Sequence, residues 1–374
     1  MSTSFVRYAP DIEKFDPHFD ELLEEVVAFW EKKGRESPAS EGTGRAVRGA
    51  HAKTFGVVEA TVEFLDGLPA EYAQGIYGKP GQHGALIRFS STSGHLGPDA
   101  HLGNGIGFAM KMFGIDGHKL MDEEPDATTF DLVLKNTPVF IANTARHYLF
   151  IEEIANDAPT YLARGMLGLH QLLSDFLTGK GTLQQPDWAW DELLAFLRAL
   201  ANPARHPLLS TYWSMGAMRH GEYIAKIRVA PSPHTAEQVL RPAIDLSTGS
   251  DVFHTALASE LDKQSYDFDL QVQLCTDLTA MPVNELTVEW PEKMSPFVTV
   301  GRVHIPRQEV SGVDGDNFDR ADALAFNQWR VTAEHAPLGE IMHVRKIYTA
   351  SAKVRRALNH QPQAEPASPE AALR

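Results

Sequence analysis

The sequence predicts an α+β fold, built on a large antiparallel β-barrel with helices around it. Two blocks of short segments are rich in β-branched and aromatic residues and are separated by Gly, Pro and Asp, which is the pattern of antiparallel strands. Between the blocks lie segments whose apolar residues recur at helical spacing. Strands in two blocks that enclose helices indicate one α+β domain. With 374 residues, 43% of them hydrophobic, the chain can bury the core of such a domain.

The N-terminal region, residues 1–45, is predicted to form a helix and an arm. Asp16 suits the N-cap, and Pro17 suits the first helical position, where a backbone N–H would have no helical partner. The apolar residues after them recur at helical spacing: Phe19, Leu22, Leu23, Val26, Val27 and Trp30. A loop rich in Gly and Ser follows this helix, so we expect the barrel domain to begin near residue 46.

The barrel domain is predicted to cover residues 46–356. Its first block of strands is expected at 55–64, 84–91, 105–114 and 130–141. Two helices are expected next, at 160–177 and 190–201, and then strands at 221–231, 265–275 and 297–305. The last predicted element is a helix from about Gly339 to Arg356. Residues 357–374 are rich in Pro and Ala, and we expect this tail to be disordered.

The composition excludes several classes of protein. A formal net charge of −15 argues against a nucleic-acid partner, which needs a basic surface. No stretch approaches the ~20 apolar residues of a membrane-spanning helix, and the first residues lack the pattern of a signal peptide. The single cysteine, Cys275, allows neither a disulfide within the chain nor a cysteine-based metal site. We therefore expect a soluble, cytoplasmic protein.

The C-terminal helix carries a charged stripe. At helical spacing, Arg345, Tyr348, Ala352 and Arg355 fall on one face, so a phenol lies between two guanidinium groups. The stripe could be an ordinary solvated basic face. Alternatively, the arginines could hold Tyr348 as a phenolate, a hard anionic ligand that suits ferric iron.

A strand in the first block carries a second candidate group. Arg88 and Ser90 share one side of this strand because side chains alternate. An arginine that points into a barrel is costly unless it meets an anion, and Arg48 could serve the same anion. Ser90 could hydrogen-bond one nitrogen of His51 and leave the other free for chemistry. Each residue also has a structural interpretation, in which Arg88 pairs with an aspartate and Ser90 bonds to backbone.

Taken together, these segments resemble the haem catalase superfamily. The likeness runs from about Arg48 to Arg356 and consists of seven motifs in the family's order. They are RGAHAKTFGVVEAT, IRFSS, GIGFAMKMF, FDLVLKNTPVFI, LTVEWPEKMSPFVTVGRVHI, LAFNQWR and the helix of Tyr348. The resemblance implies a catalase-like antiparallel barrel with surrounding helices and a haem b buried beside the barrel.

The resemblance also implies roles for individual residues. His51 would be the distal acid–base group, oriented by Ser90, and Tyr348 would be the proximal iron ligand. The haem propionates would be held by Arg48, Arg88 and Arg355. Phe140 would stack near the haem edge.

This sequence departs from the family's pattern in three places. The family's distal Asn aligns with Lys135, while Asn136 follows it, and a shift of one residue reverses the face of a strand. We favour Asn136 for the haem side, because a buried lysine without a partner is costly. The Arg four residues before the ligand Tyr is Val344 here, and Arg345 could compensate. The chain is also far shorter than a full-length catalase, which is typical of relatives that act as peroxidases.

The expected function is haem-dependent decomposition or reduction of hydrogen peroxide or organic hydroperoxides, with an unknown organic electron donor. One alternative is a fatty-acid hydroperoxide isomerase or lyase of the allene oxide synthase type. Another is a haem-binding or lipid-binding barrel without turnover. We expect a homo-oligomer, with a dimer as the first guess.

Overall fold

The computed structural model describes residues 4–99, 105–239, 243–310, 321–362 and 365–373. Its described strands are β1 (Thr54–Phe64), β2 (Gly81–Ser91), β3 (Ile106–Phe113), β4 (Thr129–Lys135), β5 (Tyr212–Trp213), β6 (Met218–His220), β7 (Tyr223–Pro231), β8 (Tyr266–Leu274) and β9 (Val298–Ile305). They form one antiparallel sheet in the order β5-β4-β3-β2-β1-β9-β8-β7-β6, and β5 also pairs with β7. That pairing closes all the described strands except β6 into a barrel, which confirms the predicted α+β barrel fold.

The barrel interior is filled by one alternating set of side chains. Ile87 and Phe89 of β2 belong to a large buried apolar cluster together with Phe108 of β3. Arg88 and Ser90 alternate with these residues, so they lie on the outer face of the barrel. The sequence argument had Arg88 pointing into the barrel. The structure places it outside, because the apolar neighbours of Arg88 occupy the interior.

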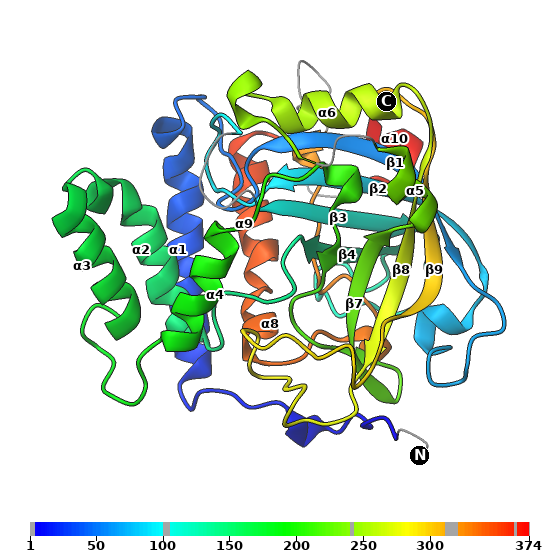
Figure 1. Cartoon of the computed structure of the whole chain (residues 1–374), viewed down its shortest axis with the longest axis horizontal. Coiled ribbons are helices and arrows are strands. Elements are labelled where there is room, and N and C mark those ends of the chain that lie inside the picture. Colours follow the sequence, from blue (N-terminus) through cyan, green and yellow to red (C-terminus); the bar gives the residue numbers. More distant parts are fainter. Residues whose placement is uncertain (1–3, 100–104, 240–242, 311–320, 363–364, 374) are drawn as a thin grey trace.

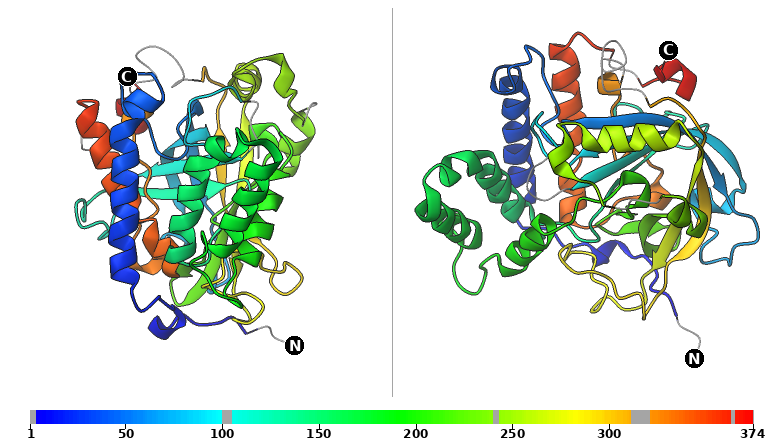
Figure 2. Two further views of the ribbon diagram at one scale, coloured as in Figure 1. Left: turned by 90° about the vertical axis from the view of Figure 1, so that its left-hand side faces the viewer. Right: turned by 45° about the horizontal axis from the view of Figure 1, so that its top comes forward.

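Helices surround the barrel (Figure 1, Figure 2). The described helices are α1 (Phe19–Ser40), α2 (Ala145–Leu162), α3 (Gly165–Thr178), α4 (Trp190–Leu200), α5 (Pro233–Gln238), α6 (Val252–Leu261), α8 (Glu340–Val344), α9 (Ile347–Leu358) and α10 (Pro369–Leu373). Helices α1 and α9 pack against each other along one flank of the barrel, and α2 to α4 lie on the same side of the molecule. Helices α1, α2 and α3 contribute to one buried apolar cluster.

Two predicted helices are each divided in the structure. The helix predicted over 160–177 is the end of α2 followed by α3, and α3 begins at Gly165 with φ +62°, a conformation that glycine adopts without strain. The helix predicted from Gly339 to Arg356 is α8 followed by α9, and Arg345 and Lys346 lie between them. The first strand block ends earlier than predicted, since β4 stops at Lys135.

The C-terminal segment differs from the disorder that its composition predicts. Its described residues include helix α10, and Ala372 is buried against the barrel. Glu365 forms an ion pair with Arg356 and lies 3.5 Å from Lys111, measured from the carboxylate oxygen to Nζ. These buried charge pairs supply the stabilisation that the Pro- and Ala-rich composition does not indicate.

Among the helices of the described residues, none is both long enough and apolar enough to span a lipid bilayer.

Candidate functional site

A buried cavity lies between helices α1 and α9 and the outer face of strands β2 to β4. Its empty space is about 760 Å³, part of it open to solvent. Its lining includes His51, Arg88 and Ser90 on the barrel side and Tyr348 and Arg355 on α9.

His51 is fixed tightly on the barrel side of this cavity. Its backbone φ is +56°, a conformation that residues other than glycine rarely adopt, and Arg88 Nη2 donates a 2.7 Å hydrogen bond to its carbonyl oxygen. Nδ1 of the ring lies 3.1 Å from Ser90 Oγ. A Cβ atom on Gly107 would lie only 2.4 Å from that nitrogen, so β3 needs glycine there. Strained backbone held by several contacts is common at functional sites.

The electrostatic environment keeps His51 neutral. Burial, followed by the positive charges around the ring, lowers the pKa of His51 to about 3. Those charges are, in decreasing order of effect, Arg88, Lys135, Arg345 and Arg48. At neutral pH the imidazole can therefore accept a proton, and anions bound beside these cations would raise its pKa and make it a stronger base.

Tyr348 lies on the α9 side of the same cavity. Arg345 Nε donates a 3.3 Å hydrogen bond to the Tyr348 hydroxyl, and the guanidinium carbon lies 5.4 Å from the centre of the phenol ring. Tyr348, Ala352 and Arg355 share the cavity-facing side of α9, as helical spacing predicts. Arg345 precedes α9, so it reaches the hydroxyl from the break between helices and not from a shared helix face.

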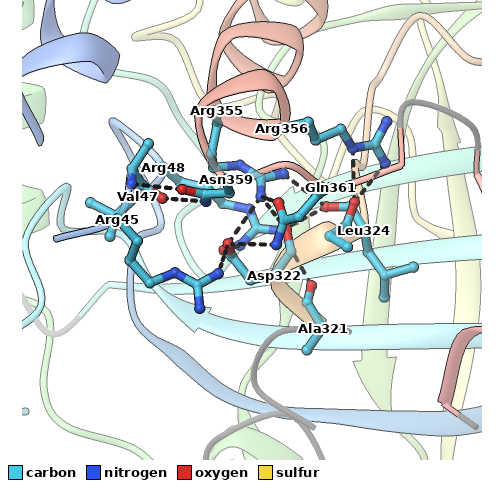
Figure 3. Close-up of polar contacts among 12 residues, drawn as sticks. Arg45, Val47, Arg48, Ala321, Asp322, Leu324, Arg355, Arg356, Asn359 and Gln361 are labelled. Atoms are coloured by element: carbon cyan, nitrogen blue, oxygen red, sulfur yellow. Dashed lines mark hydrogen bonds and ion pairs between the residues drawn. The ribbon is translucent and has the colours of Figure 1, made fainter. Parts of the chain in front are cut away.

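Three arginines converge on one carboxylate at the cavity (Figure 3). Asp322 accepts hydrogen bonds from Arg48 at 2.6 Å, from Arg45 at 2.9 Å and from Arg355 at 3.1 Å. Despite its burial, the nearby guanidinium groups, led by Arg48, hold the pKa of Asp322 at about 2. Burial, followed by the neighbouring charge of Arg88, lowers the pKa of Arg48 to about 9. Several guanidinium groups thus gather around one buried carboxylate, and such a cluster of cations favours the binding of anions.

Arg45 and Asp322 are absent from the residues that sequence reasoning selected. Arg45 lies three residues before Arg48. No local sequence pattern identifies it as a hydrogen-bond partner of Asp322, which is 277 positions away. Asp322 lies two residues before the LAFNQWR segment, and that position was its only sequence signal.

The order of Lys135 and Asn136 at the end of β4 is resolved by the strand register. Lys135 pairs with Gly107, and Gly107 pairs with Ser90, so the three positions share the His51 face. Asn136 instead accepts a 2.7 Å hydrogen bond from the backbone N–H of Ile106 through its side-chain oxygen. The register therefore places Lys135, and not the favoured Asn136, on the face of Ser90 and His51, and the negative charge of Glu152 partly offsets the cost of burying the lysine.

Phe140, which the resemblance places near the haem edge, makes its described contacts outside the cavity lining. Its ring stacks on Tyr148 at a centroid distance of 6.0 Å, and its backbone N–H bonds to the carbonyl of Leu286. Phe140 is not among the described residues that line the cavity. Its contacts support a packing role between the barrel and α2.

Comparisons with known proteins agree with this architecture. No protein-family model matches the chain, and no curated protein matches its sequence. Among solved structures it is similar to a fungal catalase, with a TM-score of 0.57 and 16% identity over 96% of this chain and 67% of that chain. It is similar to catalase A from Saccharomyces cerevisiae, with a TM-score of 0.57 and 16% identity over 96% and 68% of the two chains. It is also similar to a bacterial catalase, with a TM-score of 0.54 and 16% identity over 96% and 64%.

The chain spans about two thirds of the length of these catalases, and the likeness extends over nearly all of its own residues. It therefore includes the barrel together with the helices that enclose the cavity. This chain has the catalase-like fold.

Proposed function

We propose that this chain binds haem b in the cavity between α9 and the barrel and uses it to decompose or reduce hydrogen peroxide or organic hydroperoxides. The observation that carries the proposal is one cavity, in a catalase-like fold, with an imidazole on the barrel side and a phenol on the helix side. Neither group would be unusual alone, but the pair on opposite sides of one cavity matches the needs of peroxide chemistry at iron.

The residues present fit a haem. The phenol oxygen of Tyr348 is a suitable ligand for ferric iron. The haem carries two propionates, and the guanidinium groups of Arg48, Arg88 and Arg355, which line the cavity, are suited to bind them. Bound there, the haem would supply a ferric iron, the redox centre at which the O–O bond of a peroxide is cleaved.

The chain's own residues would move and hold the protons. Neutral His51 would accept the proton from one peroxide oxygen and return it to the other, so that the departing group leaves as water or an alcohol. Ser90 would hold Nδ1 of His51, which leaves Nε2 for this transfer. Arg345 would keep the Tyr348 oxygen oriented through its hydrogen bond. A second peroxide or an organic donor would supply the electrons that complete the turnover.

The experiment is to produce the protein with ample haem supply and to measure its absorption spectrum and peroxide consumption. His51→Ala should retain haem and lose at least about a hundredfold in peroxide consumption, the usual size of a general acid–base contribution. Tyr348→Phe should alter the ferric spectrum, because the phenol ligand is lost. Unchanged consumption in the first variant, or an unchanged spectrum in the second, would contradict the assigned roles.

One observation favours a second candidate, a haem-binding barrel without turnover. Lys135 occupies the face of His51 where the resemblance implies an amide. Haem-loaded protein that fails to consume any peroxide would support this candidate. Rearranged products from a lipid hydroperoxide, in place of alcohol and oxidised donor, would instead indicate an isomerase.

A further inference from the structure

Lys135 is a half-buried cation that the proposed chemistry does not use. It is the last residue of β4 and lies opposite Gly107, the glycine whose missing side chain leaves room for the His51 ring. Of the neighbouring charges, that of Lys135 has the second largest effect on His51. Lys135 therefore lies on the His51 face of the sheet, beside the residues that line the cavity.

Within the described residues, the side-chain ammonium of Lys135 forms no hydrogen bond and no ion pair within 4 Å. The groups that act on it are Glu152, whose negative charge favours the ammonium form, and Arg345, whose positive charge opposes it. Burial is the largest effect and lowers the pKa of Lys135 to about 8, so the side chain remains mostly charged at neutral pH.

Glu152 does not neutralise this lysine completely. Burial raises the pKa of Glu152. Its carboxylate also interacts with the charge of Lys33 and accepts a hydrogen bond from Tyr148. Arg48 and Arg355 donate hydrogen bonds to Asp322, and Lys135 forms no hydrogen bond with that aspartate. A buried ammonium without a hydrogen-bonded acid is costly, and an anionic ligand beside it would remove that cost.

We propose that Lys135 makes this site selective for a peroxide that carries its own negative charge, such as an organic hydroperoxide bearing a carboxylate. The inference rests on the proposed function and specifies its substrate class. Lys135 is a specificity-determining residue here: its ammonium attracts the anionic end of the substrate while His51 handles the protons of the peroxide group. Neutral peroxides would still enter, but without this attraction.

The test compares a short-chain hydroperoxy carboxylic acid with its methyl ester, which differs mainly in charge. For the wild-type protein loaded with haem, kcat/KM for the acid should exceed that for the ester by about tenfold or more, the effect of one nearby charge at reduced dielectric. Lys135→Met should bring the ratio close to one, and Lys135→Arg should retain most of the preference. Both variants keep a long side chain, so packing along β4 is preserved.

A binding measurement adds a readout that does not depend on turnover. Azide affinity of the ferric protein, followed by absorption, should fall about tenfold in Lys135→Met, whereas affinity for neutral imidazole should stay within about twofold. An acid-to-ester ratio and an azide affinity that are the same in wild type and Lys135→Met would overturn this inference while the proposed function stands. A protein that binds no haem would overturn the proposed function, and this inference with it.

Discussion

Replacement of Asp322 by asparagine tests the charge balance of the arginine cluster directly. The variant Asp322→Asn keeps the shape of the side chain but removes the one carboxylate on which Arg45, Arg48 and Arg355 converge. A carboxyl whose pKa falls from 3.8 to about 2 is stabilised in its charged form by about 2 kcal/mol. We therefore expect the variant without haem to lose about 2 kcal/mol of its free energy of unfolding at pH 7.

Denaturant unfolding followed by circular dichroism measures this loss, and the pH dependence gives a second check. Because folding lowers the pKa of Asp322, its stabilisation is complete above about pH 4 and is lost as the pH falls through about 2. The difference between wild type and variant should shrink over that range. Asp267→Asn is a matched control, since Asp267 forms a half-exposed ion pair with His304 and should cost less than about 1 kcal/mol.

Bound haem should reduce the effect of Asp322→Asn, because propionates would supply the missing negative charge to the same arginines. An equal loss of stability in both variants would refute the reasoning that one buried acid balances the cluster. An unreduced loss in haem-loaded protein would refute the assignment of these arginines to the propionates.

Three further predictions follow from particular contacts. Gly107→Ala should displace His51 and Ser90, cost about 1–3 kcal/mol of stability and reduce peroxide consumption, whereas Gly97→Ala, with open space around it, should be neutral in both assays. Azide affinity of the ferric protein should fall as the pH rises through about 8, where Lys135 loses its charge, and this step should be missing in Lys135→Met. Glu365→Gln should increase the rate of limited proteolysis of the C-terminal segment at least about fivefold, because the segment loses its ion pair with Arg356 and its charge beside Lys111. An unchanged cleavage rate would mean that α10 holds the segment in place without the charge of Glu365.

Much of the architecture could be predicted because alternation and turn residues are local properties of the sequence. The strands of both blocks and the shared face of Tyr348 and Arg355 follow from periodicity alone. The contact between His51 and Ser90 was also expected, and the structure brings their side chains to 3.1 Å. Their chemical roles remain predictions.

The remaining features depend on contacts between distant segments. The sequence could not show that Arg88 faces outward, because alternation gives two faces without saying which of them is the interior. The choice between Lys135 and Asn136 depended on where β4 ends and on its register with β3, which fixes the face of every residue in the strand. Asp322 acts through arginines more than 30 and more than 270 positions away, so no local pattern identifies it.

The barrel is closed by its shortest strand, and this closure has a consequence for how the molecule opens. β5 contributes only Tyr212 and Trp213, which pair with two residues of β7 and, through Trp213, with Lys135 of β4. So few ladder bonds make a seam that can part at a much lower free energy than the long pairings of β1 with β2. Local opening at this seam would loosen the end of β4. Lys135 is therefore attached to the part of the barrel whose strand pairing opens at the lowest free energy.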